Sequence, residues 1–302
     1  MNPIHSIKTA IQKALRCALI FVACAFAFQA RANDVAAQQL LNKFAALEQR
    51  LNQNAFMRPI VLDSLETPNR AAGEIHAVVD YPFAVVSAAL NRPDHWCDVI
   101  SLHINTKYCR PEVLPGGTLL KVNIGKKTPE SLENAPRIEF NYQAIEQTPR
   151  YLAIALDAKT GPMGTSNYRI ELEAVALPNN KSFLHLSYSY SMNFAARFAV
   201  QTYLATVGSS KLGFTQIGGT SNNQRQYITG VRALVERNTM RYYLAIDSFL
   251  ASATDEPSTR LEKRLQAWFT ATERYPGQLH ELDRGTYLLM KRDEYQRQQT
   301  AQ

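Results

Sequence analysis

The sequence predicts an α+β fold in which a curved antiparallel sheet wraps around one long C-terminal helix. The helix is Val231–Leu250, where apolar residues recur at steps of three and four over roughly five turns without Gly or Pro. The sheet is predicted from alternating segments between residues 60 and 192, joined by connections rich in Gly, Pro, Asn and Lys. A helix with so wide an apolar face needs a large partner surface, which such a sheet provides.

Residues 1–32 have the features of a secretory signal peptide. A basic head precedes an unbroken apolar run of 12 residues, Cys17–Phe28, and Ala30-Arg31-Ala32 is a small-x-small cleavage site. The run is shorter than the about 20 apolar residues that a membrane span needs, which disfavours an uncleaved anchor. A lipoprotein signal at Cys24 is also disfavoured, because the usual Leu three places earlier is missing. We therefore expect cleavage after Ala32 and a periplasmic or secreted protein.

The charge of the chain argues against a nucleic-acid partner. The signal segment holds four basic residues and no acidic ones, so the formal net charge falls from +7 to +3 for the 270 residues that remain. These residues contain no Lys/Arg run interleaved with aromatic residues. A chain of this length is enough for one good hydrophobic core with small extensions.

Two cysteines, Cys97 and Cys109, remain after the signal segment. In an exported protein an isolated pair predicts a disulfide, which closes a short loop here and contributes roughly 3 kcal/mol in the chain-entropy model. A buried free thiol is the alternative. Two cysteines make a poor metal site, and we predict neither a metal nor a cofactor.

An amphipathic helix is predicted within residues 33–58, because Leu40, Phe44, Leu47 and Leu51 follow helical spacing. Its polar face is mostly Gln and Asn, which favours packing on the outside of the domain over binding to a membrane surface. The elements that follow are two strands, two short helices and five further strands. Their predicted bounds are Ile60–Leu65, Gly73–Val79, Phe83–Leu90, Asp94–Leu102, Leu119–Gly125, Arg137–Ile145, Tyr151–Leu156, Tyr168–Val175 and Phe183–Met192.

This order of elements resembles the START-like, or SRPBCC, superfamily, which includes lipid-transfer domains and polyketide cyclases. The residues that carry the resemblance read GEIHAVVDYPFAVVSAAL, NRPDHWCDVI and VRALVERNTMRYYLAIDSFL. The resemblance covers about residues 60–250 and implies a helix-grip fold, in which the sheet and the helix enclose a hydrophobic cavity. We therefore expect a ligand-binding domain at 59–251 and a two-helix appendage at 252–302.

The chain departs from the superfamily pattern at residues 193–230, where a short connection is usual. Phe194–Val207 is almost wholly apolar, and Gly208–Gly219 contains four glycines around Phe214. An apolar helix followed by a glycine-rich hinge is typical of a mobile lid over a cavity mouth. An additional helix packed in the core is the alternative.

The predicted interior is apolar with several phenol groups. On Phe183–Met192, Tyr188 and Tyr190 share the apolar face, and Tyr142 and Tyr168 fall on the apolar faces of their own strands. Tyrosines suit a mostly apolar ligand with one or two polar atoms. The alternative, which is the more common role of a single tyrosine, is simple packing in the core with the hydroxyl at the rim. The predicted ligand-binding residues are Tyr142, Tyr168, Tyr188, Tyr190, Asn238 and Tyr242.

Asn238 is included because it lies within the apolar stripe of the long helix. An amide buried there without partners costs a few kcal/mol, so it bonds neighbouring backbone or tyrosines, or it meets a polar atom of a ligand. Glu236 and Arg237, beside it in the sequence, are interpreted as surface charges.

No catalytic motif is recognised, and we predict no catalytic residue. The chain has no G-x-S-x-G, H-E-x-x-H, phosphate-binding glycine loop or CxxC motif, and its histidines are scattered along the sequence. The segment Asp94–Asp98 contains residue types that are common in catalytic sites, but Asp94 is better interpreted as the start of a helix. The sequence thus favours binding or trafficking of a lipid or isoprenoid-like molecule, with possible transient membrane contact. A cyclase- or hydrolase-like enzyme that uses the same cavity is the alternative.

Overall fold

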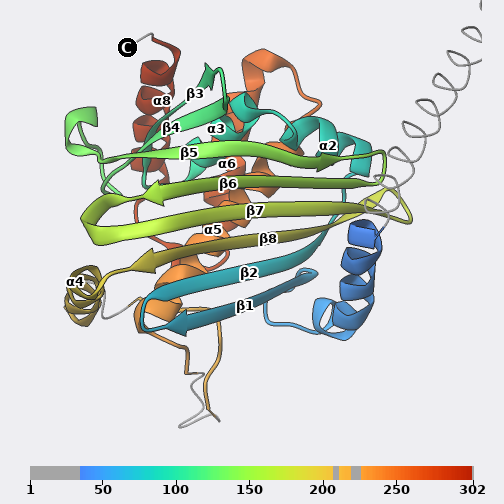
Figure 1. The fold of residues 1–302 in the computed structure, drawn as a ribbon, viewed down its shortest axis with the longest axis horizontal. Helices are drawn as coiled ribbons and strands as arrows, with labels where there is room; N and C mark the ends of the chain where they lie inside the picture. Colours follow the sequence, from blue (N-terminus) through green and yellow to red (C-terminus); the bar gives the residue numbers. More distant parts are fainter. Residues whose placement is uncertain (1–34, 207–210, 219–225, 301–302) are drawn as a thin grey trace, which may run out of the picture.

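The structure of the protein, a computed structural model, describes residues 35–206, 211–218 and 226–300 (Figure 1). The predicted signal peptide lies outside these residues. The described chain forms an antiparallel eight-stranded sheet in the order β1-β2-β8-β7-β6-β5-β4-β3. The strands are β1 Ile60–Thr67, β2 Arg70–Val79, β3 Thr106–Leu114, β4 Gly117–Ile124, β5 Arg137–Gln147, β6 Tyr151–Thr160, β7 Thr165–Leu177 and β8 Lys181–Met192.

The long helix α5, Gly230–Ala251, lies behind the sheet and packs against β1, β2 and β8 (Figure 1). It crosses β2 at Gly73, where an added Cβ would overlap Oγ1 of Thr239 and lie 3.2 Å from its Cβ. The absence of a side chain at Gly73 therefore permits close packing of helix and sheet. The predicted fold class, a curved antiparallel sheet around a long helix with further helices at both ends of the chain, is confirmed.

The strands agree with the sequence pattern in number and order, apart from β3. The sequence pattern predicts no bounds for β3, because Pro111 and the charged residues beside it interrupt the alternation. β3 lies at one edge of the sheet and pairs with β4 alone. A proline is tolerated there, since an edge strand has a side on which no backbone N–H is needed.

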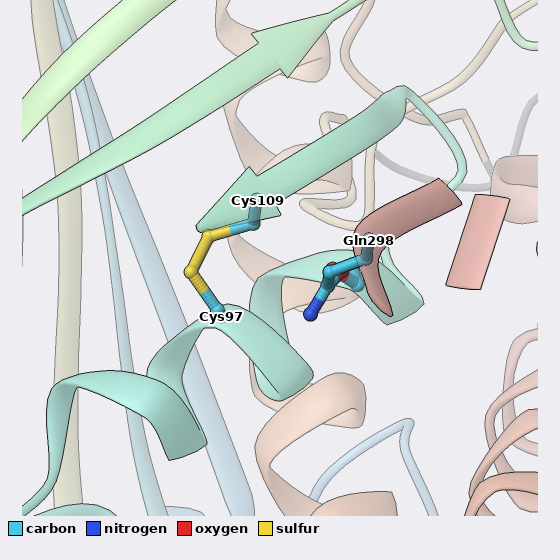
Figure 2. Close-up of a disulfide and its surroundings, with 4 residues drawn as sticks. Cys97, Cys109 and Gln298 are labelled. Atoms are coloured by element: carbon cyan, nitrogen blue, oxygen red, sulfur yellow. A yellow bond between two sulfur atoms is a disulfide. The ribbon is translucent and has the colours of Figure 1, made fainter. Parts of the chain in front are cut away.

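The short helices α2, Phe83–Leu90, and α3, Pro93–Leu102, connect β2 to β3. A disulfide joins Cys97 of α3 to Cys109 of β3, with Cα atoms 5.1 Å apart (Figure 2). The predicted pairing is thus confirmed. Gln298, near the end of the chain, lies close by and accepts a hydrogen bond from the Ser101 hydroxyl at 2.9 Å.

The central helix is buried on nearly all sides, and this corrects one expectation. Glu236 and Arg237 are not surface charges: their exposed fractions are 0% and 2%. The segment 211–218 covers them, since Glu236 accepts hydrogen bonds from the backbone N–H groups of Phe214 (2.6 Å) and Thr215 (3.0 Å), and Arg237 donates to the carbonyl of Leu212 (3.0 Å). The helical pattern alone showed which residues were polar but not that residues 211–218 would cover them.

The N-terminal helix, residues 35–52, packs on the outer face of the sheet and forms a second, smaller core there. Leu40, Leu47 and Leu51 are buried against outward-facing residues that include Phe183. Phe44 adds a ring contact to Phe183 at 5.2 Å between centroids. Among the described residues, no helix combines the length and the apolar character needed to cross a membrane.

The C-terminal helices are part of the main core rather than a separate layer. They are α6 Pro257–Thr272, α7 Pro276–Leu279 and α8 Arg284–Gln299. Trp268 of α6 stacks on Tyr287 of α8 at 4.9 Å, and both residues belong to the same buried cluster as the inner face of the sheet. α6 and α7 pack against α5, and α8 packs against α6 and β3.

Candidate functional site

Four of the predicted tyrosines meet between the sheet and α5. Tyr168 stacks on Tyr190 at 5.4 Å between ring centroids, and Tyr188 lies 5.7 Å from Tyr190 and 5.2 Å from Tyr242. Alternation along β7 and β8 turns three of these rings to the inner face, and α5 supplies the fourth. We call Tyr168, Tyr188, Tyr190 and Tyr242 the tyrosine cluster.

Asn238 joins this cluster through its amide. It forms a side-chain hydrogen bond with the hydroxyl of Tyr188, and its Oδ1 accepts a hydrogen bond from Arg241 at 3.4 Å. Of the roles considered for a polar residue on this stripe, bonding to a tyrosine is therefore present in the structure. Whether Asn238 also contacts a ligand stays a prediction.

Tyr142 lies on the same face of the sheet but stands apart from the cluster. The strand register aligns Tyr142 with Leu156, Leu156 with Ile170, and Ile170 with Tyr188. Three strand spacings separate Tyr142 from Tyr188, which corresponds to roughly 14 Å. The Tyr142 hydroxyl is shielded from solvent and has no hydrogen-bond partner among the described residues. Tyr142 and Tyr188 thus lie on one row of the sheet, and Tyr142 is the one predicted tyrosine outside the cluster.

His103, which sequence reasoning did not select, belongs to the same interior. Its ring stacks on Tyr242 at 4.8 Å, and its Nδ1 accepts a hydrogen bond from the Asn105 N–H at 3.2 Å. Its Nε2 is buried and has no partner among the described residues. Because His103 lies in the loop after α3, no periodic pattern indicated that its ring faces inward.

The ionisation of these groups favours hydrogen bonding over acid–base chemistry. Burial, reinforced by the positive charges of Arg241 and nearby lysines, holds the pKa of His103 well below its usual range. The ring is therefore neutral at pH 7 and presents an N–H at Nε2, since Nδ1 acts as an acceptor. Burial raises the pKa of Tyr142 to about 12 and raises the pKa of Tyr188 further. These phenols stay protonated and act as hydrogen-bonding groups.

Two pockets open elsewhere on the described chain, and neither is lined by the predicted tyrosines. The first, of about 200 Å³, lies between α3, β3, α6 and α8 and is lined by His95, Asp98, Lys107 and Arg264 among others. Asp98 is paired with Arg264 at 2.9 Å, and Nδ1 of His95 is bonded to the carbonyl of Ala89 at 2.7 Å. The second, of about 690 Å³, is an open groove beside the N-terminal helix. In the first pocket, His95 and Asp98 of the Asp94–Asp98 segment already have protein partners.

The segment considered as a lid has two parts with different environments. Helix α4, Phe194–Ala205, leaves Phe194 and Phe198 exposed by 87% and 65%, whereas Ala196 is buried. The part at 211–218 is tied to α5 through Glu236 and Arg237, as described above. Residues 207–210 and 219–225, which include two of the four glycines of the glycine-rich stretch, lie outside the described chain. The lid therefore stays a prediction.

A separate polar cluster occupies the outer face of the sheet, where no metal site had been predicted. Glu74, His76 and His185 place potential ligand atoms within 4.8 Å of one another. Burial lowers the pKa of His185, but the carboxylates of Glu173 and Glu74 outweigh this effect and raise it to about 9. Burial and the His185 charge lower the pKa of His76 to about 4. At neutral pH one imidazole of this pair is charged and the other is neutral.

No protein-family model and no curated protein sequence matches the chain. Among solved structures it is similar to Ara h 8.0201, with a TM-score of 0.36, 11% identity, and coverage of 61% of this chain and 99% of that one. The Zhui aromatase/cyclase from Streptomyces sp. R1128 gives a TM-score of 0.34 and 12% identity over 61% of this chain and 93% of that one. Norcoclaurine synthase from Thalictrum flavum gives a TM-score of 0.31 and 11% identity over 50% of this chain and 77% of that one.

At these identities and TM-scores the similarities say nothing about activity. The fold is shown by the chain itself: a strand leads into two short helices, six antiparallel strands follow, and a long helix returns across the sheet. The expected resemblance to the START-like superfamily is confirmed at this level. β1 extends the arrangement by one strand, which pairs with β2 at the sheet edge.

Proposed function

We propose that this chain, which has a START-like helix-grip fold, binds a hydrophobic small molecule with one or two polar atoms between its sheet and α5. The observation that carries the proposal is the pair of buried polar groups without partners, Nε2 of His103 and the hydroxyl of Tyr142, in an interior made mostly of aliphatic and aromatic side chains. A buried polar group left unpaired costs about 1–3 kcal/mol. A ligand that supplies the missing hydrogen bonds offsets this cost.

The surrounding groups define the chemistry of the ligand. Tyr188 and Tyr242 present ring faces, and the inner faces of β6 and β7 add Leu156, Ile170 and Leu172. Both unpaired groups carry a hydrogen that a ligand oxygen would accept, and Tyr142 lies roughly 14 Å from Tyr188 along the sheet. These features fit an elongated apolar molecule with oxygen at its polar positions, such as a lipid or an isoprenoid.

Export and a transient membrane contact belong to the same proposal. The signal-like segment at residues 1–32 supports a periplasmic or secreted location. The exposed rings of Phe194 and Phe198 on α4 offer an apolar surface through which a carrier would meet a bilayer. We expect the double substitution Phe194→Ser and Phe198→Ser to reduce sedimentation of the mature protein with phospholipid vesicles.

The proposal is tested first by native mass spectrometry of the mature protein, purified without detergent after export. We expect an adduct that organic extraction identifies as a hydrophobic molecule. Conversion of that molecule during incubation would instead support the enzyme alternative. If no adduct forms, and if neither oleic acid nor farnesol binds in titrations, both functions are excluded for these ligand classes.

Ligand position is tested by removing single hydroxyl groups. Tyr142→Phe removes an unpaired interior hydroxyl, so we expect roughly two- to tenfold weaker binding, the effect of losing one hydrogen bond. Tyr243→Phe is the matched control: its hydroxyl is also buried without a partner among the described residues, but its ring lies beside Arg58, at 5.8 Å. Equal effects of the two substitutions would place the ligand outside the proposed interior.

The tyrosine cluster offers a second readout. Its rings contact one another in the structure, so a ligand that enters between them must separate them. We expect the near-ultraviolet circular dichroism of the tyrosines to change on loading. An unchanged spectrum at saturation would show that binding occurs elsewhere.

A further inference from the structure

The outer face of the sheet brings together histidines that are far apart in sequence. His76 of β2 is directly opposite His185 of β8, and His185 is directly opposite Glu173 of β7. Glu74 precedes His76 by two residues and therefore projects from the same face. Strand pairing thus places four potential ligand or support groups beside one another, on the side of the sheet opposite the tyrosine cluster.

One distance within this group is close to the spacing of two ligand atoms on a metal ion. Ligand atoms of Glu74, His76 and His185 all lie within 4.8 Å of one another, and Nε2 of His185 lies 3.7 Å from Oε2 of Glu74. Ligand atoms bound tetrahedrally to zinc at about 2.0–2.1 Å lie roughly 3.3 Å apart. Contraction by about half an ångström at this pair brings it to that spacing.

A supporting hydrogen bond orients one of the imidazoles. Nδ1 of His185 lies 2.7 Å from Oε2 of Glu173, and the hydroxyl of Tyr151 donates to the other oxygen of Glu173. A carboxylate on the remote ring nitrogen is the usual support of a metal-binding histidine, because it fixes the ring and makes the free nitrogen more basic. Here it leaves Nε2 directed toward Glu74.

The second imidazole is buried with an unpaired nitrogen. His76 is only 2% exposed, and its Nδ1 has no hydrogen-bond partner among the described residues. Its ring is packed between that of His185, at 4.4 Å, and that of Phe183, at 6.0 Å. A buried nitrogen of this kind is costly unless something binds it.

We propose that Glu74, His76 and His185 form a binding site for a divalent transition-metal ion of the Zn²⁺ or Cu²⁺ type. Two imidazoles and one carboxylate suit these ions better than Mg²⁺ or Ca²⁺, which prefer oxygen ligands. The ion replaces the proton on Nε2 of His185. Three protein ligands leave a further coordination position for water or another small ligand.

The charges around the site set limits on its affinity. Lys43 of the N-terminal helix and Asp63 of β1 are near enough to affect the pKa of His76, with opposite signs. Asp63 is already paired with Arg50 at 2.7 Å.

The two histidine rings are nearly parallel, at 7°, so His76 must turn before its nitrogen points at an ion shared with His185. Entry is from the side of Glu74, whose side chain is 48% exposed.

The test is calorimetric titration of ZnCl₂, CuCl₂ and MgCl₂ into the mature, untagged protein after treatment with EDTA. We expect one Zn²⁺ or Cu²⁺ per chain, micromolar or tighter affinity, and no response to MgCl₂. Glu74→Gln and His185→Gln should each weaken binding at least tenfold, and Glu173→Gln by roughly tenfold or more through loss of ring support. Because Glu74 is exposed, its substitution removes a ligand with little risk to folding.

His280→Gln is the matched control, since His280 also contacts a glutamate, Glu273 at 3.0 Å, but has no second histidine beside it in the described chain. We expect it to bind Zn²⁺ as the unaltered protein does. The imidazole NMR signals of His76 and His185 should both shift with one equivalent of Zn²⁺. The proposal fails if no ion binds at 100 micromolar, or if binding persists at full strength in Glu74→Gln and His185→Gln. These outcomes are independent of whether the interior holds a lipid.

Discussion

The close approach of α5 to β2 requires a residue without a side chain at position 73. A methyl group there would overlap Oγ1 of Thr239, and the carbonyl of Val235 is 3.5 Å away. Thr239 cannot turn its hydroxyl away from the methyl group without losing the hydrogen bond that it donates to this carbonyl at 2.8 Å. We expect Gly73→Ala to lower the free energy of unfolding by about 1–3 kcal/mol, as overpacking does. Urea denaturation measures this change.

Two further variants show whether the overlap is the cause. Thr239→Ala in the Gly73→Ala background removes the overlapping oxygen and should restore part of the lost stability. Gly116→Ala, in the turn between β3 and β4, has no atom within 4 Å of the added methyl group and should change stability by less than about 0.5 kcal/mol. Equal losses in Gly73→Ala and Gly116→Ala would contradict the proposed close packing.

Removing a buried tyrosine hydroxyl should raise or lower the free energy of unfolding, depending on whether that hydroxyl has a hydrogen-bond partner. Without ligand, Tyr142→Phe and Tyr243→Phe should each raise the free energy of unfolding by about 1 kcal/mol, because each removes an unpaired buried group. Tyr168→Phe should lower it by a similar amount, because the Tyr168 hydroxyl donates to Thr165 at 2.9 Å. Thermal and urea unfolding of the three variants measure these effects. A destabilised Tyr142→Phe variant would indicate that a bound water satisfies the Tyr142 hydroxyl.

At the scale of elements, α8 is held by a buried group of charges. Glu294 pairs with Lys107 of β3 at 3.0 Å and with Lys291 at 2.8 Å, and all three side chains are at most 6% exposed. Lys291 also donates to the carbonyls of His103 (2.7 Å) and Thr106 (2.8 Å). Burial lowers the pKa of Lys291 to about 8, against the opposing effect of Glu294. One carboxylate therefore compensates two buried ammonium groups.

We expect Glu294→Gln to lower the free energy of unfolding by about 3–5 kcal/mol, because two buried cations lose their counter-charge. Glu262→Gln is the matched control: Glu262 pairs with Arg292 of the same helix at 2.8 Å, but both side chains are more than 40% exposed. That substitution should cost at most about 1 kcal/mol. Urea denaturation of both variants at pH 7 measures the two losses. Similar losses would mean that burial of the first group has little energetic weight.

At the scale of the whole molecule, the ionisation of His103 should make the free energy of unfolding depend on pH. Four positive groups affect it, Arg241 of α5, Lys291 of α8, Lys107 of β3 and Lys127, and together with burial they keep its folded pKa far below 6.5. Below pH 6.5 the unfolded chain therefore binds a proton at His103 that the folded chain does not. Stability contributed by the neutral ring is present above pH 6.5 and is lost as the pH falls, by up to about 1.4 kcal/mol per pH unit.

His103→Gln removes this proton uptake. Between pH 6.5 and 4.5 we expect the free energy of unfolding of this variant to fall less steeply than that of the unaltered protein. The two slopes should differ by up to about 1.4 kcal/mol per pH unit. Between pH 7 and 8 the two profiles should run parallel, which is the internal control. Urea titrations at each pH, with EDTA present, provide the data. Identical slopes at acid pH would show that His103 accepts a proton in the folded state.

Local patterns were enough to predict the architecture. Alternation identified β2 and β4–β8, helical spacing identified α5 within one residue at each end, and two cysteines left in a signal-bearing chain predicted the Cys97–Cys109 disulfide. The inward faces of Tyr188, Tyr190 and Tyr242 also followed from periodicity. These properties depend on the geometry of one strand or one helix turn, which neighbouring residues in the chain determine.

Only the tertiary structure decided which groups meet across the sheet and which charges are buried. His76 and His185 are 109 positions apart in the sequence, and no single strand encodes the register that pairs them. His103 faces the interior because a loop turns it there, and Glu236 is buried because residues 211–218 fold over it. The sequence by itself determined the elements and their faces, since those follow from local backbone geometry. The candidate sites required the long-range contacts that form when all the elements pack together.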